Sequence, residues 1–213
     1  MIASSSWMID GGSMMAALPR RIILASRSPR RLELARAEGW DVRVAPAPEE
    51  AEAAVPRGAD EPLESFVRRA AHAKAEAIAT TGVEGLILAC DTLAELDGEP
   101  LGKPMDRADA RRMLTALSGR THRVVSGVCL WLQPGPTPLL ADAESVLEMD
   151  RLSDEFLDWY LDSGLWRGKA GACGFQDERL PLRLVSGSPS NVVGLPIELI
   201  REMLTDLDCQ PRS

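Results

Sequence analysis

Two hydroxyl groups and three guanidinium groups crowd one short stretch of the chain, Ala25 to Arg31. In a protein whose formal net charge is −8, such a concentration of basic groups predicts a binding site for an anion, and phosphate fits the forked guanidinium group well. The side chains that we expect to make the contacts are those of Ser26, Arg30 and Arg31. The alternative is a capped helix whose arginines are only solvated.

An aspartate at the end of an apolar run is the second candidate for chemistry. The run from Gly85 to Cys90 has the length of a strand and no charged residue, which is typical of a central strand covered on both faces. We expect it to end at Asp91 and Thr92. Ligands of open α/β sheets bind beyond the carboxyl ends of strands, where an aspartate can hold Mg²⁺ or activate water. The alternative is an aspartate that only caps a turn.

Two lysines lie where they could reach a phosphate. Lys74 falls on the apolar face of the helix predicted over residues 61–80. On periodicity alone such a lysine extends to the edge of the core, but together with the other cations an inward orientation is favoured. Lys103 is flanked by Gly102 and Pro104, which let the backbone approach a ligand and hold the lysine extended.

Small residues surround a third lysine, Lys169, in the stretch 168–176. They would allow close approach to a ligand, and the stretch ends in Gln176, whose amide donates and accepts and so can read a base edge. The alternative is a glycine-rich connection. Upstream, residues 45–60 are predicted to be a loop that holds Glu49, Glu50 and Glu52, one of which could reach a metal ion from above the pocket.

The elements that must position these side chains alternate between strands and helices. An apolar run at 22–24 followed by Ser28 and Pro29 predicts a strand, a tight turn and a capped helix. His72 and His122 are isolated, and no Ser/His/Asp triad is evident. Further strands are predicted at 40–44, 121–132, 139–149 and 180–185, further helices at 106–117, 153–163 and 197–207, and a polar turn at 187–191.

Composition narrows the class of protein. The net charge of −8 and the pI of about 4.9 argue against binding to long nucleic acid, which needs a basic face. The four cysteines form no CxxC pair, so reduced thiols in a cytoplasmic protein fit best. No apolar run approaches the roughly 20 residues of a membrane span. We expect one domain of two lobes at 20–208, a disordered extension at 1–19 and a loose tail at 209–213.

Together these stretches resemble the Maf family of nucleoside triphosphate pyrophosphatases. Each piece is weak alone, but the pieces occur in the family's order over about residues 20–207, and the ordered set is specific. The matching pieces are residues 25–31, 70–75, 89–92, 101–104, 117–122, 168–171, Gln176 and 191–196.

The resemblance implies an α/β fold of the Maf and inosine-triphosphatase type, in which a long, mixed, bent sheet is flanked by helices and two lobes surround a cleft. It implies hydrolysis of a nucleoside triphosphate to monophosphate and pyrophosphate with Mg²⁺ or Mn²⁺, and a possible homodimer. Arg30, Thr92 and Gln176 match the family's dTTP/UTP branch. The alternatives are 7-methyl-GTP or modified nucleotides as substrates, or a non-catalytic nucleotide-binding regulator of cell division.

The resemblance implies, residue by residue, that Asp91 is the general base and a metal ligand. It makes Glu50 a second metal ligand, with Glu49 as a close rival. The residues expected to hold the triphosphate are Ser26, Arg30, Arg31, Lys74, Lys103 and Lys169. The chain departs from the family pattern near the predicted base-reading wall, with Leu165 for an acid, Cys173 for a tyrosine and Asp177 for a glycine.

Overall fold

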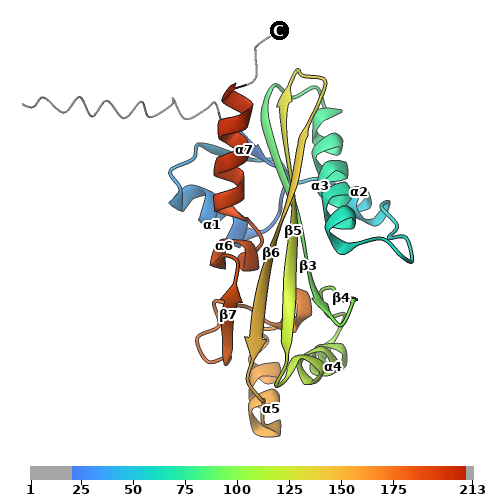
Figure 1. Ribbon diagram of the computed structural model, residues 1–213, viewed down its shortest axis with the longest axis vertical. Helices are drawn as coiled ribbons and strands as arrows, with labels where there is room; N and C mark the ends of the chain where they lie inside the picture. The colour runs from blue at the N-terminus through green and yellow to red at the C-terminus, as the bar shows by residue number, and fades with distance from the viewer. Residues whose placement is uncertain (1–20, 210–213) are drawn as a thin grey trace, which may run out of the picture.

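The computed structural model describes residues 21–209 of the chain. They form a mixed α/β protein on one seven-stranded sheet, in the order β2-β1-β3-β5-β6-β7 with β4 paired to β3 (Figure 1). The predicted fold class is therefore confirmed. The strands are β1 (Ile22–Leu24), β2 (Val42–Val44), β3 (Gly85–Leu96), β4 (Glu99–Leu101), β5 (Thr121–Gln133), β6 (Leu139–Met149) and β7 (Leu182–Ser186).

Three long antiparallel strands, β3, β5 and β6, run almost the length of the molecule (Figure 1). Strand β1 pairs in parallel with β2 on one side and with β3 on the other. The expected end of the central strand at Asp91 and Thr92 is wrong, because β3 continues to Leu96. Both polar side chains have partners inside the fold, Lys74 for the aspartate and Arg31 for the threonine, so neither has to end the strand.

Helices cover both faces of the sheet at its β1 end. Leu86 and Leu88 pack with α7, whereas Ile87 and Ala89 pack with α3, as alternation along a strand requires. The helices are α1 (Pro29–Ala37), α2 (Glu49–Ala53), α3 (Leu63–Ala79), α4 (Arg107–Leu117), α5 (Asp154–Ser163), α6 (Pro189–Val193), α7 (Ile197–Cys209) and a 3₁₀ turn, η1 (Ala170–Ala172).

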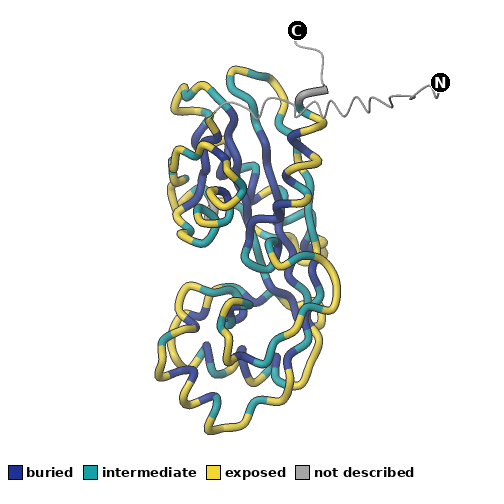
Figure 2. Tube along the Cα trace, turned by 90° about the vertical axis from the view of Figure 1, so that its left-hand side faces the viewer, coloured by how far each residue is buried: buried dark blue, intermediate teal, exposed yellow. Residues whose placement is uncertain are grey.

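A separate hydrophobic core lies at the other end of the long strands. There, Ala94 and Leu96 of β3 and Leu147 of β6 pack with the inner faces of α4 and α5. Buried segments therefore occur in two bodies that the long strands join (Figure 2). This arrangement gives the two lobes that the sequence predicted.

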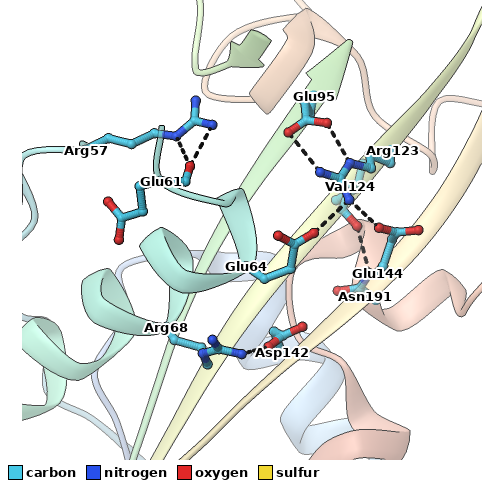
Figure 3. Close-up of polar contacts among 10 residues, drawn as sticks. All are labelled: Arg57, Glu61, Glu64, Arg68, Glu95, Arg123, Val124, Asp142, Glu144 and Asn191. Atoms are coloured by element: carbon cyan, nitrogen blue, oxygen red, sulfur yellow. Dashed lines mark hydrogen bonds and ion pairs between the residues drawn. The ribbon is translucent and has the colours of Figure 1, made fainter. Parts of the chain in front are cut away.

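Ion pairs hold the first turn of α3 to the long strands. The Arg123 guanidinium on β5 donates to the carboxylates of Glu95, Glu64 and Glu144, over 2.6, 2.7 and 2.7 Å (Figure 3). Hydrogen bonding to Glu95, the largest contribution, raises the pKa of Arg123. Because these carboxylates come from β3, α3 and β6, the network fixes the helix on the sheet face that carries Asp91.

Two expectations about loops are wrong. Residues 49–53 form the single turn of helix α2, and residues 189–193 form α6, capped by Ser188. Helices this short show no apolar periodicity in the sequence. Helix α7 extends to Cys209, so this residue belongs to the helix and not to the predicted tail. The predicted extension at 1–19 lies outside the described residues. Within residues 21–209, no helix has the length and hydropathy needed to cross a membrane.

Candidate active site

A gap at one edge of strand β3 forms the centre of the site. Along this edge β3 pairs with β1 as far as Leu88 and with β4 from Ala94 onward. Asp91 and Thr92 lie between, with no strand beside them on this edge in the described part of the chain. The β1–α1 turn closes over the gap, because the Ala25 N–H donates to the Leu88 carbonyl at 2.9 Å. The sheet topology therefore brings this turn to Asp91.

Arg31 fills the gap with its guanidinium group. Its Nε donates to the Gly194 carbonyl at 2.7 Å, and its Nη1 donates to the Cys90 carbonyl at 2.9 Å. Its Nη1 also reaches the Ser26 hydroxyl at 3.3 Å, and its Nη2 reaches the Thr92 hydroxyl at 3.0 Å. The guanidinium group has five N–H donors, and four hydrogen bonds from it are made within the protein. Arg31 chiefly orders the site, with little capacity left for a ligand.

Asp91 forms a buried ion pair with Lys74. The lysine Nζ lies 2.6 Å from Oδ1 of the aspartate, and the two residues are 9% and 5% exposed. Helix α3 comes this close because Gly127, opposite Asp91 on β5, has no side chain, and a Cβ there would lie 2.2 Å from the Val67 carbonyl oxygen. The inward orientation of Lys74 is therefore confirmed.

A pocket of about 330 Å³ opens beside this ion pair. Six basic side chains line it against one acidic side chain, Glu49, so an acidic protein has a strongly basic pocket. These basic side chains come from four stretches that are distant in sequence: α1 with the turn before it, α3, the segment after β4 and the segment after α5. The basic residues are Arg27, Arg30, Arg31, Lys74, Lys103 and Lys169.

The pocket also has an apolar wall, formed by the second core. It consists of side chains from β3, β5, β6, β7 and α6: Ala94, Val124, Leu147, Leu182 and Val192. Arg30 links the two lobes across the pocket, since its Nη2 donates to the Gly168 carbonyl at 3.3 Å. One pocket thus combines cations for a phosphate chain with an apolar surface for a ring.

Lys169 is held by the carboxylate of Asp177. Its Nζ lies 2.5 Å from an Asp177 oxygen, with the two side chains 14% and 10% exposed. The Tyr160 hydroxyl donates to the same aspartate at 2.6 Å. Burial, ahead of the hydrogen bond to Asp177, raises the pKa of Tyr160, and burial raises the pKa of the neighbouring Cys173 thiol to about 12. Both groups are therefore neutral at physiological pH.

Replacing Asp177 with alanine is expected to destabilise the fold by about 3 kcal/mol, because it leaves the Lys169 ammonium buried without its counter-charge. Urea unfolding at neutral pH measures the change. Glu148→Ala is the control, since its partner Arg183 is 68% exposed and the pair contributes little. Equal, small shifts for both variants would show that the Lys169–Asp177 pair does not stabilise the wall.

The structure separates some predicted site residues from the others. The predicted residues that line the pocket are Ser26, Arg30, Arg31, Lys74, Thr92, Lys103 and Lys169, whereas Asp91 is outside the lining and contacts it through its ion pair with Lys74. Gln176 is exposed and lines a different recess with Trp159 and Leu165, so its predicted part in base reading stays untested. Glu50 is exposed and outside the pocket lining, whereas Glu49 lines it and pairs with Arg27.

The acidic groups fit a cation that a nucleotide helps to hold. No group of three His, Cys, Asp or Glu side chains able to bind a metal occurs among the described residues. Magnesium bound with a nucleotide needs only one or two carboxylates, because phosphate oxygens and water complete its shell. Two carboxylates are available here: Glu49 lines the pocket and pairs with Arg27, and Asp91 pairs with Lys74 beside the pocket.

Fold and pocket together define a two-lobed α/β protein with a basic pocket beside a buried aspartate. The model of one family, described as "Maf-like protein", matches residues 21–207, and the chain therefore belongs to the Maf family. This confirms the resemblance found in the sequence.

Similar proteins carry a specific name. The "dTTP/UTP pyrophosphatase" of Rhodopirellula baltica is 41% identical over 191 residues, covering 89% of this chain and 83% of the relative. That of Symbiobacterium thermophilum is 44% identical over 187 residues, covering 87% and 93%. Among solved structures, a HAM1 protein from Coxiella burnetii matches with a TM-score of 0.48 and 20% identity over 87% of this chain and 98% of that one.

Proposed function

We propose that this protein hydrolyses dTTP and UTP to the nucleoside monophosphate and pyrophosphate. The observation that carries the proposal is a single pocket in which six cations and an apolar wall meet, with the buried ion pair of Lys74 and Asp91 beside it. Cations match a triphosphate chain, the apolar wall matches a nucleobase, and the aspartate can accept a proton from water. Two relatives similar over most of the chain are named for this activity.

In the proposed reaction, water attacks the α-phosphorus and the bond to the β-phosphate oxygen breaks. Asp91 accepts the proton of the attacking water, and Lys74 fixes the carboxylate's orientation through the 2.6 Å ion pair. The new oxygen stays on the monophosphate, and pyrophosphate leaves with the other two phosphates. The negative charge that develops on pyrophosphate is stabilised by Arg30, Lys103 and Lys169.

The cations differ in their freedom to bind phosphate. Lys103 is exposed, lines the pocket and forms no ion pair within the described residues, so it can close onto a ligand. Lys169 is held by Asp177, and Arg31 is occupied by Ser26, Thr92 and two carbonyls, so both supply a fixed positive charge. Ser26 completes the phosphate end of the pocket.

We also propose that a divalent cation, Mg²⁺ or Mn²⁺, enters with the nucleotide. Asp91 would hold it together with Glu49 or, as predicted from the sequence, Glu50. When bound, such a cation neutralises phosphate charge and polarises the phosphoryl oxygens. The cytoplasm, where nucleotides are made, is the proposed location, and the homodimer stays a prediction.

The test is pyrophosphate release from a panel of nucleoside triphosphates with Mg²⁺ or Mn²⁺. We expect dTTP and UTP to be the best substrates, and a chelator to abolish release. In heavy-oxygen water, attack at the α-phosphorus labels the monophosphate and leaves pyrophosphate unlabelled. Binding without release would identify a regulator, and faster hydrolysis of 7-methyl-GTP would overturn the substrate assignment.

A further inference from the structure

His122 lies at the inner wall of the pocket. It is on β5, opposite Leu147 of β6 and two residues before Val124, so all three side chains share the sheet face that forms the apolar wall. It is 4% exposed, yet it lines the pocket. In the sequence this histidine is isolated from the other candidate residues.

The imidazole has polar atoms and no protein partner for them. Neither Nδ1 nor Nε2 has a hydrogen-bond partner among the described residues. Burial lowers the pKa of His122 to about 4, so the ring is neutral near pH 7 and carries one N–H donor and one acceptor. Buried polar groups are normally paired, because an unpaired one costs stability. A buried ring with both nitrogens unpaired, in the wall of a pocket, therefore indicates a ligand as the missing partner.

The side chains around His122 indicate which part of a nucleotide would be its hydrogen-bond partner. Val124 and Leu147 share the sheet face of His122, and neither side chain offers a charge to a phosphate. Lys74 pairs with Asp91, which lies opposite Gly127 on β5, five residues beyond His122 along the strand. A neutral donor and acceptor on an apolar wall matches a flat ring with carbonyl and N–H groups.

We propose that His122 hydrogen-bonds the pyrimidine base of the substrate and is a specificity-determining residue, an inference that rests on the proposed function. Uracil and thymine present two carbonyl acceptors and one N–H donor, so a neutral imidazole can pair with either kind of group. The role that the sequence assigned to Gln176 is thereby given to a residue that lines the pocket.

The test compares a ligand that has a base with one that lacks it. In His122→Leu we expect kcat/KM for dTTP and UTP to fall about tenfold, the loss of one hydrogen bond, while the inhibition constant of inorganic tripolyphosphate stays unchanged. Because the substitution removes two unpaired buried nitrogens, Tm should rise. His122→Asn, which keeps a donor and an acceptor, should recover part of the activity.

The matched control is His72→Leu, since the chain has two histidines and His72 stacks on Trp131 with ring centroids 5.5 Å apart, outside the pocket lining. It should leave both ligands unaffected. Unchanged kcat/KM in His122→Leu, or equal losses for dTTP and tripolyphosphate, would overturn the inference. If the wild type releases no pyrophosphate, the proposed function fails, and calorimetric binding of the same two ligands still decides the role of His122.

Discussion

Replacing Asp91 with asparagine is expected to lower kcat for dTTP by about a hundredfold to ten-thousandfold, the usual contribution of a general base. The amide keeps the size of the side chain but cannot accept the proton of water. KM should change much less, because the cations that hold the triphosphate remain in the pocket. Pyrophosphate release under saturating dTTP measures the effect.

Asp97→Asn is the matched control for this variant. Asp97 lies in the turn after β3, and its carboxylate is 65% exposed and pairs with Arg120 at the surface. The same chemical change should leave kcat unaltered there. A wild-type rate in Asp91→Asn, with the folded state verified by circular dichroism, would remove the aspartate from the reaction.

Much of the fold could be predicted because local signals agreed with the tertiary structure. Ser28 accepts the Arg31 N–H and Pro29 begins α1, as the cap and proline predicted. Gly164, with a φ of 72°, ends α5 as expected. The same pair of signals, Ser188 followed by Pro189, also marks the start of α6. There the sequence predicts a polar turn, because only five helical residues follow.

The continuation of β3 could not be predicted because its cause is distant in sequence. An aspartate and a threonine after an apolar run look like the end of a strand. They remain in the strand because Lys74, 17 residues before Asp91, forms its ion pair, and because Arg31, 61 residues before Thr92, donates to its hydroxyl. Such pairings depend on which elements become neighbours in the sheet.

The basic side chains of the site were predictable as a set, and their individual states were not. The glycines and other small or turn residues around Lys103 and Lys169 indicated these two lysines, but only the structure shows that Asp177 holds the second of them. Gln176 has the right chemistry for a base and lies in another recess. His122 lies in the stretch 117–122 that resembles the family, but that match predicts no role for it, because what marks the side chain is burial without a hydrogen-bond partner.

Replacing Lys74 with methionine is expected to destabilise the protein by about 3–5 kcal/mol, because it leaves a carboxylate that is 5% exposed without its ion-pair partner. Methionine fills most of the lysine's volume, so the change reports the lost charge and not a cavity. Urea unfolding at neutral pH measures it. Activity should fall as well, since the Asp91 carboxylate loses the contact that orients it.

The double variant Lys74→Met with Asp91→Asn separates this electrostatic effect from a general loss of packing. Lys74→Met leaves the buried Asp91 carboxylate without this ion pair, whereas the double change removes both charges of the pair. The double variant should therefore be more stable than the sum of the single changes predicts, with a coupling of about 1–3 kcal/mol. Strictly additive losses would mean that the two side chains stabilise the fold independently, and that Lys74 does not position the aspartate.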